Sequence, residues 1–134
     1  MTCVKIVPLE LLKIARDVMS NAYCPYSKYQ VGAALLGDNG MVVSGCNVEN
    51  VSYGLSICAE RVAFGTGISK GVRRFLAIAV VSSGKKLPYP CGACRQIMAE
   101  FCSPDFMIYI ATSKSIKSFL SVKLGELLPH SFRL

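Results

Sequence analysis

Apolar side chains recur at two different periods along this chain, which predicts alternating helices and strands. Near the N-terminus they return every three to four positions, as on a helix with one buried face, and Pro8 suits the first turn of that helix. Further along, apolar residues form short runs bounded by Gly, Asn and Ser, which indicates strands and turns. The expected helices are 8–22, 56–64, 92–101 and 123–128, and the expected strands are 30–36, 41–48, 75–81, 106–111 and 116–122.

Glycine and serine residues mark several of the expected boundaries. Gly37-Asp38-Asn39-Gly40 is typical of a hairpin turn between the first two strands. Ser56 is the expected N-cap of the second helix, and Gly65-Thr66-Gly67 its expected end. The unbroken apolar run 75–81 is typical of a strand buried on both faces. This order predicts an α/β fold, a three-layer α/β/α sandwich around a mixed sheet of about five strands.

Length and composition add limits to this picture. The 134 residues suit a single domain, 1–134, with its own hydrophobic core. Hydrophobic residues make up 52%, but no window approaches the roughly 18 uninterrupted apolar residues of a membrane helix. We therefore expect the apolar excess to lie in subunit interfaces, and no membrane partner. Seven cysteines, an odd number without a secretory leader, favour a reducing cytoplasm over a disulfide framework.

The formal net charge of +7 raises the question of a nucleic-acid partner. The lysines and arginines are scattered, however, with no long basic run and no basic helical stripe carrying aromatic side chains. This pattern is typical of solvated surface charges. The sequence therefore predicts no specific nucleic-acid partner.

Two short motifs carry the clearest chemistry: Cys58-Ala59-Glu60 and Pro90-Cys91-Gly92-Ala93-Cys94. Three thiolates with an open fourth position are typical of a catalytic zinc site, because a structural site usually fills all four positions with protein ligands. Cys58 and Cys91 fall near expected helix starts, where the helix dipole favours thiolates. A structural zinc knuckle would need a second C-x-x-C pair, and a redox C-x-x-C would leave Cys58 and Glu60 unexplained.

These motifs belong to a longer ordered set that runs from about Leu9 to Phe132. Its members are 25–34, 45–50, 58–61, 90–96 and 126–129. In these stretches the chain resembles the cytidine deaminase family, in its small homotetrameric zinc-dependent form. The resemblance implies one Zn²⁺ per chain, held by Cys58, Cys91 and Cys94. It also implies that activated water attacks C4 of a pyrimidine while Glu60 moves the protons.

Two arginines lie where they could offset the negative charge of such a site. Three thiolates around Zn²⁺ give a net charge of about −1, which makes the metal a weaker Lewis acid toward bound water. Arg61 and Arg95 each follow a motif directly, and a guanidinium donating to the ligand sulfurs would withdraw charge. The resemblance supports Arg61 most directly. For Arg95 a surface ion pair is an equally open interpretation.

The resemblance also implies a set of substrate contacts. Asn47 and Glu49 would hold the 3′-hydroxyl of a ribose, and they stand two apart, so both can face one side of a strand. Tyr29 stands where the family usually has a phenylalanine stacked on the base. Val51, Tyr53 and Phe132 match positions that reach a neighbouring subunit's site, although plain packing is an alternative for the aromatic residues. Ala59 completes the substrate-binding set, and we expect no role for Cys3, Cys24, Cys46, Cys102 or His130.

The predicted function is zinc-dependent hydrolytic deamination of cytidine and 2′-deoxycytidine, a step of pyrimidine salvage, by a cytoplasmic homotetramer with shared sites. Three alternatives stay in view. A deaminase of another aminopyrimidine, such as blasticidin S, would not need the pair Asn47 and Glu49. A deaminase of cytosine in nucleic acid would need extra loops or a basic groove. A zinc-stabilised interaction protein would not need Glu60.

Overall fold

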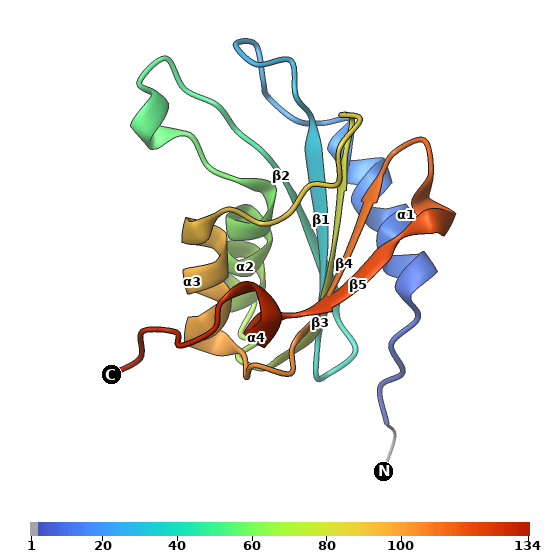
Figure 1. Cartoon of the computed structure of the whole chain (residues 1–134), viewed down its shortest axis with the longest axis vertical. Coiled ribbons are helices and arrows are strands. Elements are labelled where there is room, and N and C mark those ends of the chain that lie inside the picture. The colour runs from blue at the N-terminus through green and yellow to red at the C-terminus, as the bar shows by residue number, and fades with distance from the viewer. Residues whose placement is uncertain (1–2) are drawn as a thin grey trace.

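A mixed sheet of five strands forms the centre of the molecule (Figure 1). The computed structural model describes residues 3–134. The strand order is β2-β1-β3-β4-β5, and only β3 and β4 run parallel to each other. The strands are β1 (Val31–Gly37), β2 (Val42–Cys46), β3 (Phe75–Ser82), β4 (Met107–Thr112) and β5 (Leu120–Lys123). The expectation of a mixed sheet of about five strands is confirmed.

Helices cover both faces of this sheet and make three layers (Figure 1). One apolar cluster contains the buried side of α1 (Pro8–Met19), and a second contains buried residues of α2 (Ala59–Ser69) and α3 (Gly92–Phe101). A short α4 (Leu124–Leu127) follows β5 and contacts α3. Single turns of 3-10 helix lie at Tyr53–Leu55 and Ile116–Ser118. Between residues 3 and 134, no helix has both the length and the apolar character that crossing a bilayer requires.

The position of α2 depends on a glycine in the neighbouring strand. A Cβ atom on Gly45 would lie 2.6 Å from the backbone nitrogen of Ala63 and 2.7 Å from the carbonyl oxygen of Ala59. Real side chains do not tolerate such distances to backbone atoms. Gly45 therefore lets α2 lie directly on β2, which fixes the start of α2 above this end of the sheet.

The second helix is longer than the sequence predicted. The expected end at residues 65–67 is wrong, because α2 continues to Ser69. Gly67 lies inside the helix, where a Cβ would meet the ring of Phe75 at 2.9 Å, so its small size serves packing. The expected N-cap, Ser56, is also wrong, because the N-cap residue is Cys58.

Three other elements differ from the expected ranges by more than one residue, and the remaining ends agree within one. The first helix ends at Met19 and not at 22, and β2 ends at Cys46 and not at 48. The expected strand 116–122 is replaced by the 3-10 turn and a shorter β5. Element ends are the least certain part of a periodic pattern, since fraying and local hydrogen bonds decide them.

Candidate active site

The three motif cysteines form a compact triangle of sulfur atoms. Cys58 is the residue before α2, Cys91 is the residue before α3, and Cys94 lies in the first turn of α3. The Sγ atoms of Cys58 and Cys91 are 3.7 Å apart, and those of Cys91 and Cys94 are 3.6 Å apart. All three sulfurs lie within 4.8 Å of one another. Two helix starts and one helical turn thus bring together residues 33 positions apart in the sequence.

This triangle fits one tetrahedral zinc ion. Zinc–sulfur bonds of about 2.3 Å in a tetrahedron place ligand sulfurs about 3.8 Å apart. The two measured edges, 3.6 and 3.7 Å, are close to that value. Three sulfurs occupy one face of the tetrahedron and leave the fourth position for another ligand, as the sequence predicted for a catalytic site.

The surroundings of Cys58 favour its thiolate form. The pKa of Cys58 is lowered to about 5, chiefly because the thiol of Cys94 donates a hydrogen bond to it, and Cys91 and the charge of Arg61 act in the same direction. The same hydrogen bond raises the pKa of Cys94, because it favours the protonated form there. A negative charge is therefore already stabilised within the sulfur triangle, which suits it to bind a cation.

Arg61 lies beside the sulfur triangle, as expected. One of its terminal nitrogens, Nη2, donates to the carbonyl oxygen of Ser56 at 2.9 Å, and its charge helps to lower the pKa of Cys58. Its Nε is buried and has no hydrogen-bond partner among the described residues. A buried, unpaired donor next to the ligand sulfurs is consistent with a charged group bound at the triangle.

Arg95 has a role that the sequence did not reveal. Its Nε donates to the carbonyl oxygen of Pro90 and its Nη1 to that of Leu127, both at 2.7 Å. In residues 3–134 the only ion pair joins Lys123 to Asp105, so Arg95 is not half of a surface ion pair. Arg95 therefore ties the residue before Cys91 to the end of α4, while its expected bond to sulfur stays a prediction.

Glu60 is one of the few buried polar or charged side chains among residues 3–134. It lies in the first turn of α2 and is 5% exposed. Its pKa is raised to about 7, mainly because burial disfavours the charged carboxylate, with a further contribution from Cys58. A carboxyl group in this range can both accept and release a proton near neutral pH, which is what a general acid/base requires.

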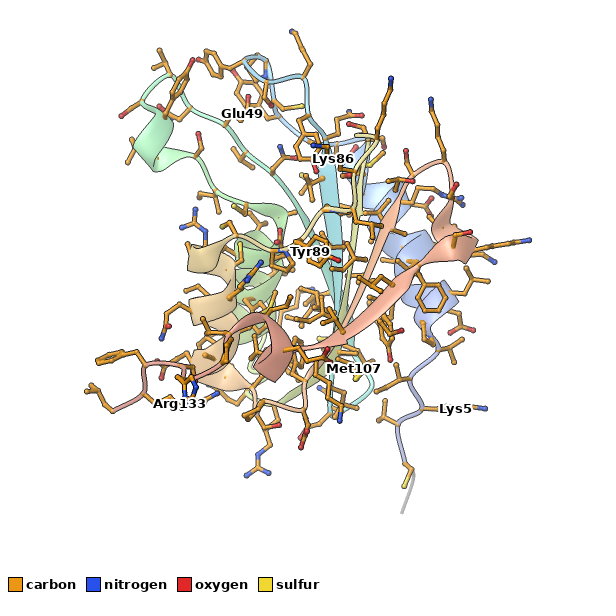
Figure 2. All side chains as sticks on the ribbon, in the orientation of Figure 1. Lys5, Glu49, Lys86, Tyr89, Met107 and Arg133 are labelled. Carbon is orange, nitrogen blue, oxygen red and sulfur yellow. The ribbon has the colours of Figure 1, made fainter. Side chains whose placement is uncertain are left out.

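A cavity of about 260 Å³ opens beside Glu60 and two of the cysteines. It brings together most of the side chains that the sequence predicted for the site: Tyr29, Asn47, Glu49, Cys58, Ala59, Glu60 and Cys91. Tyr89 and Glu49, both labelled in Figure 2, belong to its lining. The lining that sequence reasoning missed is mostly apolar: Val31, Ser56, Ile57, Val80, Pro88 and Tyr89. Val31 and Val80 sit in strand patterns like any core residue, so no sequence signal distinguished them.

Asn47 lines the cavity and also holds the backbone beside it through two hydrogen bonds. Its Oδ1 accepts from the backbone N–H of Val31 at 2.9 Å, and its Nδ2 donates to the carbonyl oxygen of Tyr29 at 2.8 Å. These two bonds join the end of β2 to the start of β1 and fix the backbone of Tyr29. One N–H of the amide stays available, so Asn47 can still donate to a ligand.

Glu49 holds the neighbouring loop. Its Oε1 accepts from the backbone N–H groups of Tyr26 and Ser27, at 3.1 and 3.2 Å, and its Oε2 accepts from the hydroxyl of Ser27. The hydroxyl of Ser27 is the main reason that the pKa of Glu49 is lowered. Glu49 is therefore ionised at neutral pH, and a carboxylate with about four acceptor positions keeps one for a ligand.

Three of the predicted substrate residues lie outside this cavity in their own chain. Val51, Tyr53 and Phe132 are 78%, 74% and 71% exposed. Tyr53 meets Tyr26 edge-on, with ring centres 5.8 Å apart, next to the loop that Glu49 holds. Phe132 lies near the C-terminus, next to α3, where the carbonyl oxygen of Phe132 accepts a hydrogen bond from Gln96. Their contact with a neighbouring subunit stays a prediction.

Comparison with known proteins agrees with this geometry. The family model described as "Cytidine and deoxycytidylate deaminase zinc-binding region" matches residues 7–110, which is more than half of the chain. The chain belongs to the cytidine deaminase family. The matched region of this family binds zinc, and Cys58, Cys91 and Cys94 are the residues here that can hold it.

Individual relatives cover nearly the whole chain. A cytidine deaminase from Halalkalibacterium halodurans is 47% identical over 122 residues, 91% of each chain. The crystal structure of a cytidine deaminase from Burkholderia pseudomallei superposes with a TM-score of 0.89 at 40% identity, over 95% of this chain and 100% of the other. A blasticidin-S deaminase from Bacillus cereus is more distant, at 26% identity over 132 residues, 92% of this chain and 91% of the other.

Proposed function

We propose that this protein hydrolyses cytidine and 2′-deoxycytidine to the corresponding uridines and ammonia. The observation that carries the proposal is the cavity, which is lined by Cys58 and Cys91 of the sulfur triangle, by the buried Glu60 and by the polar pair Asn47 and Glu49. Each part has a distinct use: a metal site, a proton carrier and a sugar contact. Membership of the cytidine deaminase family supports the same reaction.

The chemistry divides between the metal and Glu60. Cys58, Cys91 and Cys94 would hold a zinc ion, which would supply a Lewis acid for the activation of water. Glu60 takes a proton from the attacking water and delivers it to N3 of the pyrimidine, which makes C4 electrophilic. Glu60 then takes the remaining proton from the hydroxyl group on C4 and passes it to the amino group, so that the C4–N bond breaks, ammonia leaves and a C4 carbonyl forms. Burial keeps Glu60 away from bulk water and holds its pKa near neutrality, so one side chain can perform each transfer.

The rest of the cavity suits a free nucleoside. Asn47 and Glu49 offer a donor and an acceptor to a ribose hydroxyl, and both are held in place by bonds to the loop and strand beside them. The apolar wall that includes Val31, Ile57 and Val80 suits a flat base. Tyr29 lines the same cavity and can stack on that base.

We further propose a cytoplasmic homotetramer that acts in pyrimidine salvage and whose sites are shared between subunits. The support is the set of large side chains that the single chain leaves in water. Val51, Tyr53 and Leu55 are at least 65% exposed and cluster on one protruding segment, and Phe132 is as exposed on the C-terminal segment. Exposed apolar groups of this kind mark interfaces.

Turnover of four substrates tests the reaction and its alternatives. Zinc-loaded protein should convert free cytidine and 2′-deoxycytidine, followed by the loss of ultraviolet absorbance. It should convert cytosine within a single-stranded oligonucleotide and blasticidin S at least about 10²-fold less well, because neither presents a free ribose to Asn47 and Glu49. Faster turnover of the oligonucleotide or of blasticidin S would transfer the proposal to that substrate. No turnover of any of them by zinc-loaded protein would contradict it.

A further inference from the structure

The C-terminal segment is fixed in place although it carries an exposed aromatic ring. After α4 the backbone turns sharply at His130, whose φ of 54° lies in the left-handed region that non-glycine residues adopt infrequently. The segment then passes beside α3 (Figure 1). Hydrogen bonds join it to α3 at two points, through Gln96 and through Arg133.

Arg133 closes the C-terminal end of α3. Its Nη1 donates to the carbonyl oxygen of Ala99 at 2.7 Å, and its Nη2 donates to that of Cys102 at 3.2 Å. Carbonyl groups in the last turn of a helix have no partner within the helix, and the helix dipole favours a cation there. The flat guanidinium bonds two of them at once, which an ammonium group cannot do with the same geometry. Its Nε donates to Ser131 Oγ at 3.1 Å, so the guanidinium also ties the segment to itself.

Gln96 holds the other side of the same short segment. Its Nε2 donates to the carbonyl oxygen of Phe132 at 3.0 Å. The backbone around Phe132 is therefore fixed from both sides, yet the side chain of Phe132 is 71% exposed. Ordering a terminal segment costs conformational entropy, and the largely exposed ring offsets little of that cost within this chain. Burial of the ring against a surface outside its own subunit would offset that cost.

We propose that Gln96 and Arg133 are positioning residues that present Phe132 to the active site of a neighbouring copy of this chain. This inference rests on the proposed function, since the occupied surface is the nucleoside cavity of the neighbour. Gln96 and Arg133 touch no substrate. They act through Phe132 by fixing the backbone of the C-terminal segment from which its ring projects.

The chain offers a matched control for Arg133. Arg73 bonds the end of α2 through one nitrogen: its Nη1 donates to the carbonyl oxygen of Ile68, in the last turn of α2, at 2.8 Å, and to that of Val72, beyond the helix, at 3.1 Å. Arg133→Met and Arg73→Met therefore each remove a guanidinium bond to a carbonyl oxygen in the last turn of a helix, but only Arg133 holds the segment with Phe132. Arg133 is labelled in Figure 2, near the C-terminal end of the chain.

Steady-state kinetics give the first readout. In Arg133→Met, we expect KM for cytidine to rise about tenfold, the scale of a lost hydrogen bond from a charged group, and in Gln96→Leu we expect a smaller rise, because that bond is neutral. In both variants kcat should change less than KM, and zinc content should not change. Arg73→Met should leave KM unchanged. In a Phe132→Ala background, Arg133→Met should raise KM no further, because there is no ring left to position.

Fluorescence gives a second readout that does not depend on turnover. The chain has no tryptophan, so Phe132→Trp introduces a single reporter. In the assembled protein its emission should be blue-shifted and protected from acrylamide. Adding Arg133→Met should red-shift the emission and raise quenching, whereas adding Arg73→Met should change neither. This measurement does not require turnover of cytidine. It can therefore support or contradict the positioning of Phe132 whether or not cytidine is the substrate.

Several results would overturn the inference. Unchanged KM and unchanged quenching in Arg133→Met would do so, as would equal effects of Arg73→Met. Full quenching of the reporter in a protein that carries Phe132→Trp alone would show that no neighbour covers the ring. If Arg133→Met fails to fold, Arg133→Lys and Gln96→Leu carry the test. Arg133→Lys keeps the charge but loses the fork, so it should raise quenching by an intermediate amount, and an unaltered value in both variants would contradict the proposal.

Discussion

At the scale of single residues, Glu60 and Glu49 show how two carboxylates on one cavity take different roles. Burial raises the pKa of Glu60 to about 7, whereas hydrogen bonds from Ser27 and its neighbours lower the pKa of Glu49. A group near neutrality can exchange protons, and a permanently ionised group can only accept hydrogen bonds. These environments support the proposed roles, proton transfer for Glu60 and substrate binding for Glu49.

Removing the proton carrier should stop the chemistry and spare the metal site. In Glu60→Gln the amide keeps the size of the side chain but cannot carry a proton. We expect retained zinc and folding, with kcat lowered by at least about 10²–10⁴-fold. Metal analysis and the ultraviolet assay measure both, and Glu10→Gln on α1 serves as a control. Near-normal turnover by zinc-loaded Glu60→Gln would place the proton transfer on another group.

The contact between Glu49 and the sugar can be tested on the substrate itself. The unaltered protein should prefer cytidine over 3′-deoxycytidine, which lacks the hydroxyl. Glu49→Ala should lower kcat/KM for cytidine by roughly 10–10²-fold, because a hydrogen bond to a charged group is lost. It should also abolish the preference, which loosening of the loop at Ser27 alone would leave intact. A variant that keeps the preference would show that Glu49 does not read the 3′-hydroxyl.

At the scale of elements, the site depends on the starts of α2 and α3. The residue before each helix is a cysteine of the sulfur triangle, and Glu60 follows in the first turn of α2. Gly45 lets α2 lie against β2, and Arg95 ties the start of α3 to the end of α4. The positions of the three sulfur atoms therefore depend on how these two helices pack against the sheet.

A single added methyl group should disturb that packing. In Gly45→Ala the new Cβ meets backbone atoms of Ala59 and Ala63, which cannot move without shifting α2. We expect a loss of about 1–3 kcal/mol in the free energy of unfolding and weaker zinc binding.

Gly65→Ala is the matched control, since a Cβ there meets nothing within 4 Å. It should instead stabilise α2 by about 1 kcal/mol, the difference in helix propensity. Urea unfolding and zinc titration measure both variants, and equal stability of Gly45→Ala and the parent would refute the packing argument.

Much of this architecture could be predicted because its signals are local. The strand runs and the periodic helix from Pro8 give the layers, and the spacing of Cys91 and Cys94 gives two metal ligands. Gly67 misled the sequence interpretation, because a glycine that serves packing against Phe75 looks the same as one that ends a helix. The apolar wall at Val31 and Val80 and the bonds of Arg95 depend on residues distant in sequence, and no periodic pattern shows such contacts.

At the scale of the whole molecule, one chain carries two aromatic side chains that lie outside its own cavity and remain largely exposed. Tyr53 and Phe132 stand on separate segments, each more than 70% exposed. If each chain contributes these side chains to the site of a neighbour, then no chain has a complete site alone. Activity would then depend on assembly and hence on protein concentration.

Mixed oligomers can test whether subunits contribute Phe132 to the sites of their neighbours. Glu60→Gln chains lack the proton carrier, and Phe132→Ala chains lack the ring, so each parent should be nearly inactive at low cytidine concentration. Mixing and reassembly should restore part of the activity, through sites that combine an intact Glu60 with an intact Phe132 from the other parent. No recovery in verified mixed oligomers would exclude Phe132 from the shared site. A fully active monomer in sedimentation at assay concentration would exclude sharing altogether.

The spacing of the sulfur triangle also sets how this protein responds to oxidants. Sulfur atoms 3.6–3.7 Å apart need to approach by only about 1.6 Å to form a covalent S–S bond, with loss of two protons and two electrons to an oxidant. Bound zinc engages the sulfur lone pairs and protects them. We expect protein stripped of zinc to lose its capacity to bind zinc when exposed to hydrogen peroxide, and to regain it with dithiothreitol. Counting free thiols before and after the treatment would follow the change. Zinc would then protect its own ligands from oxidation in addition to its part in catalysis.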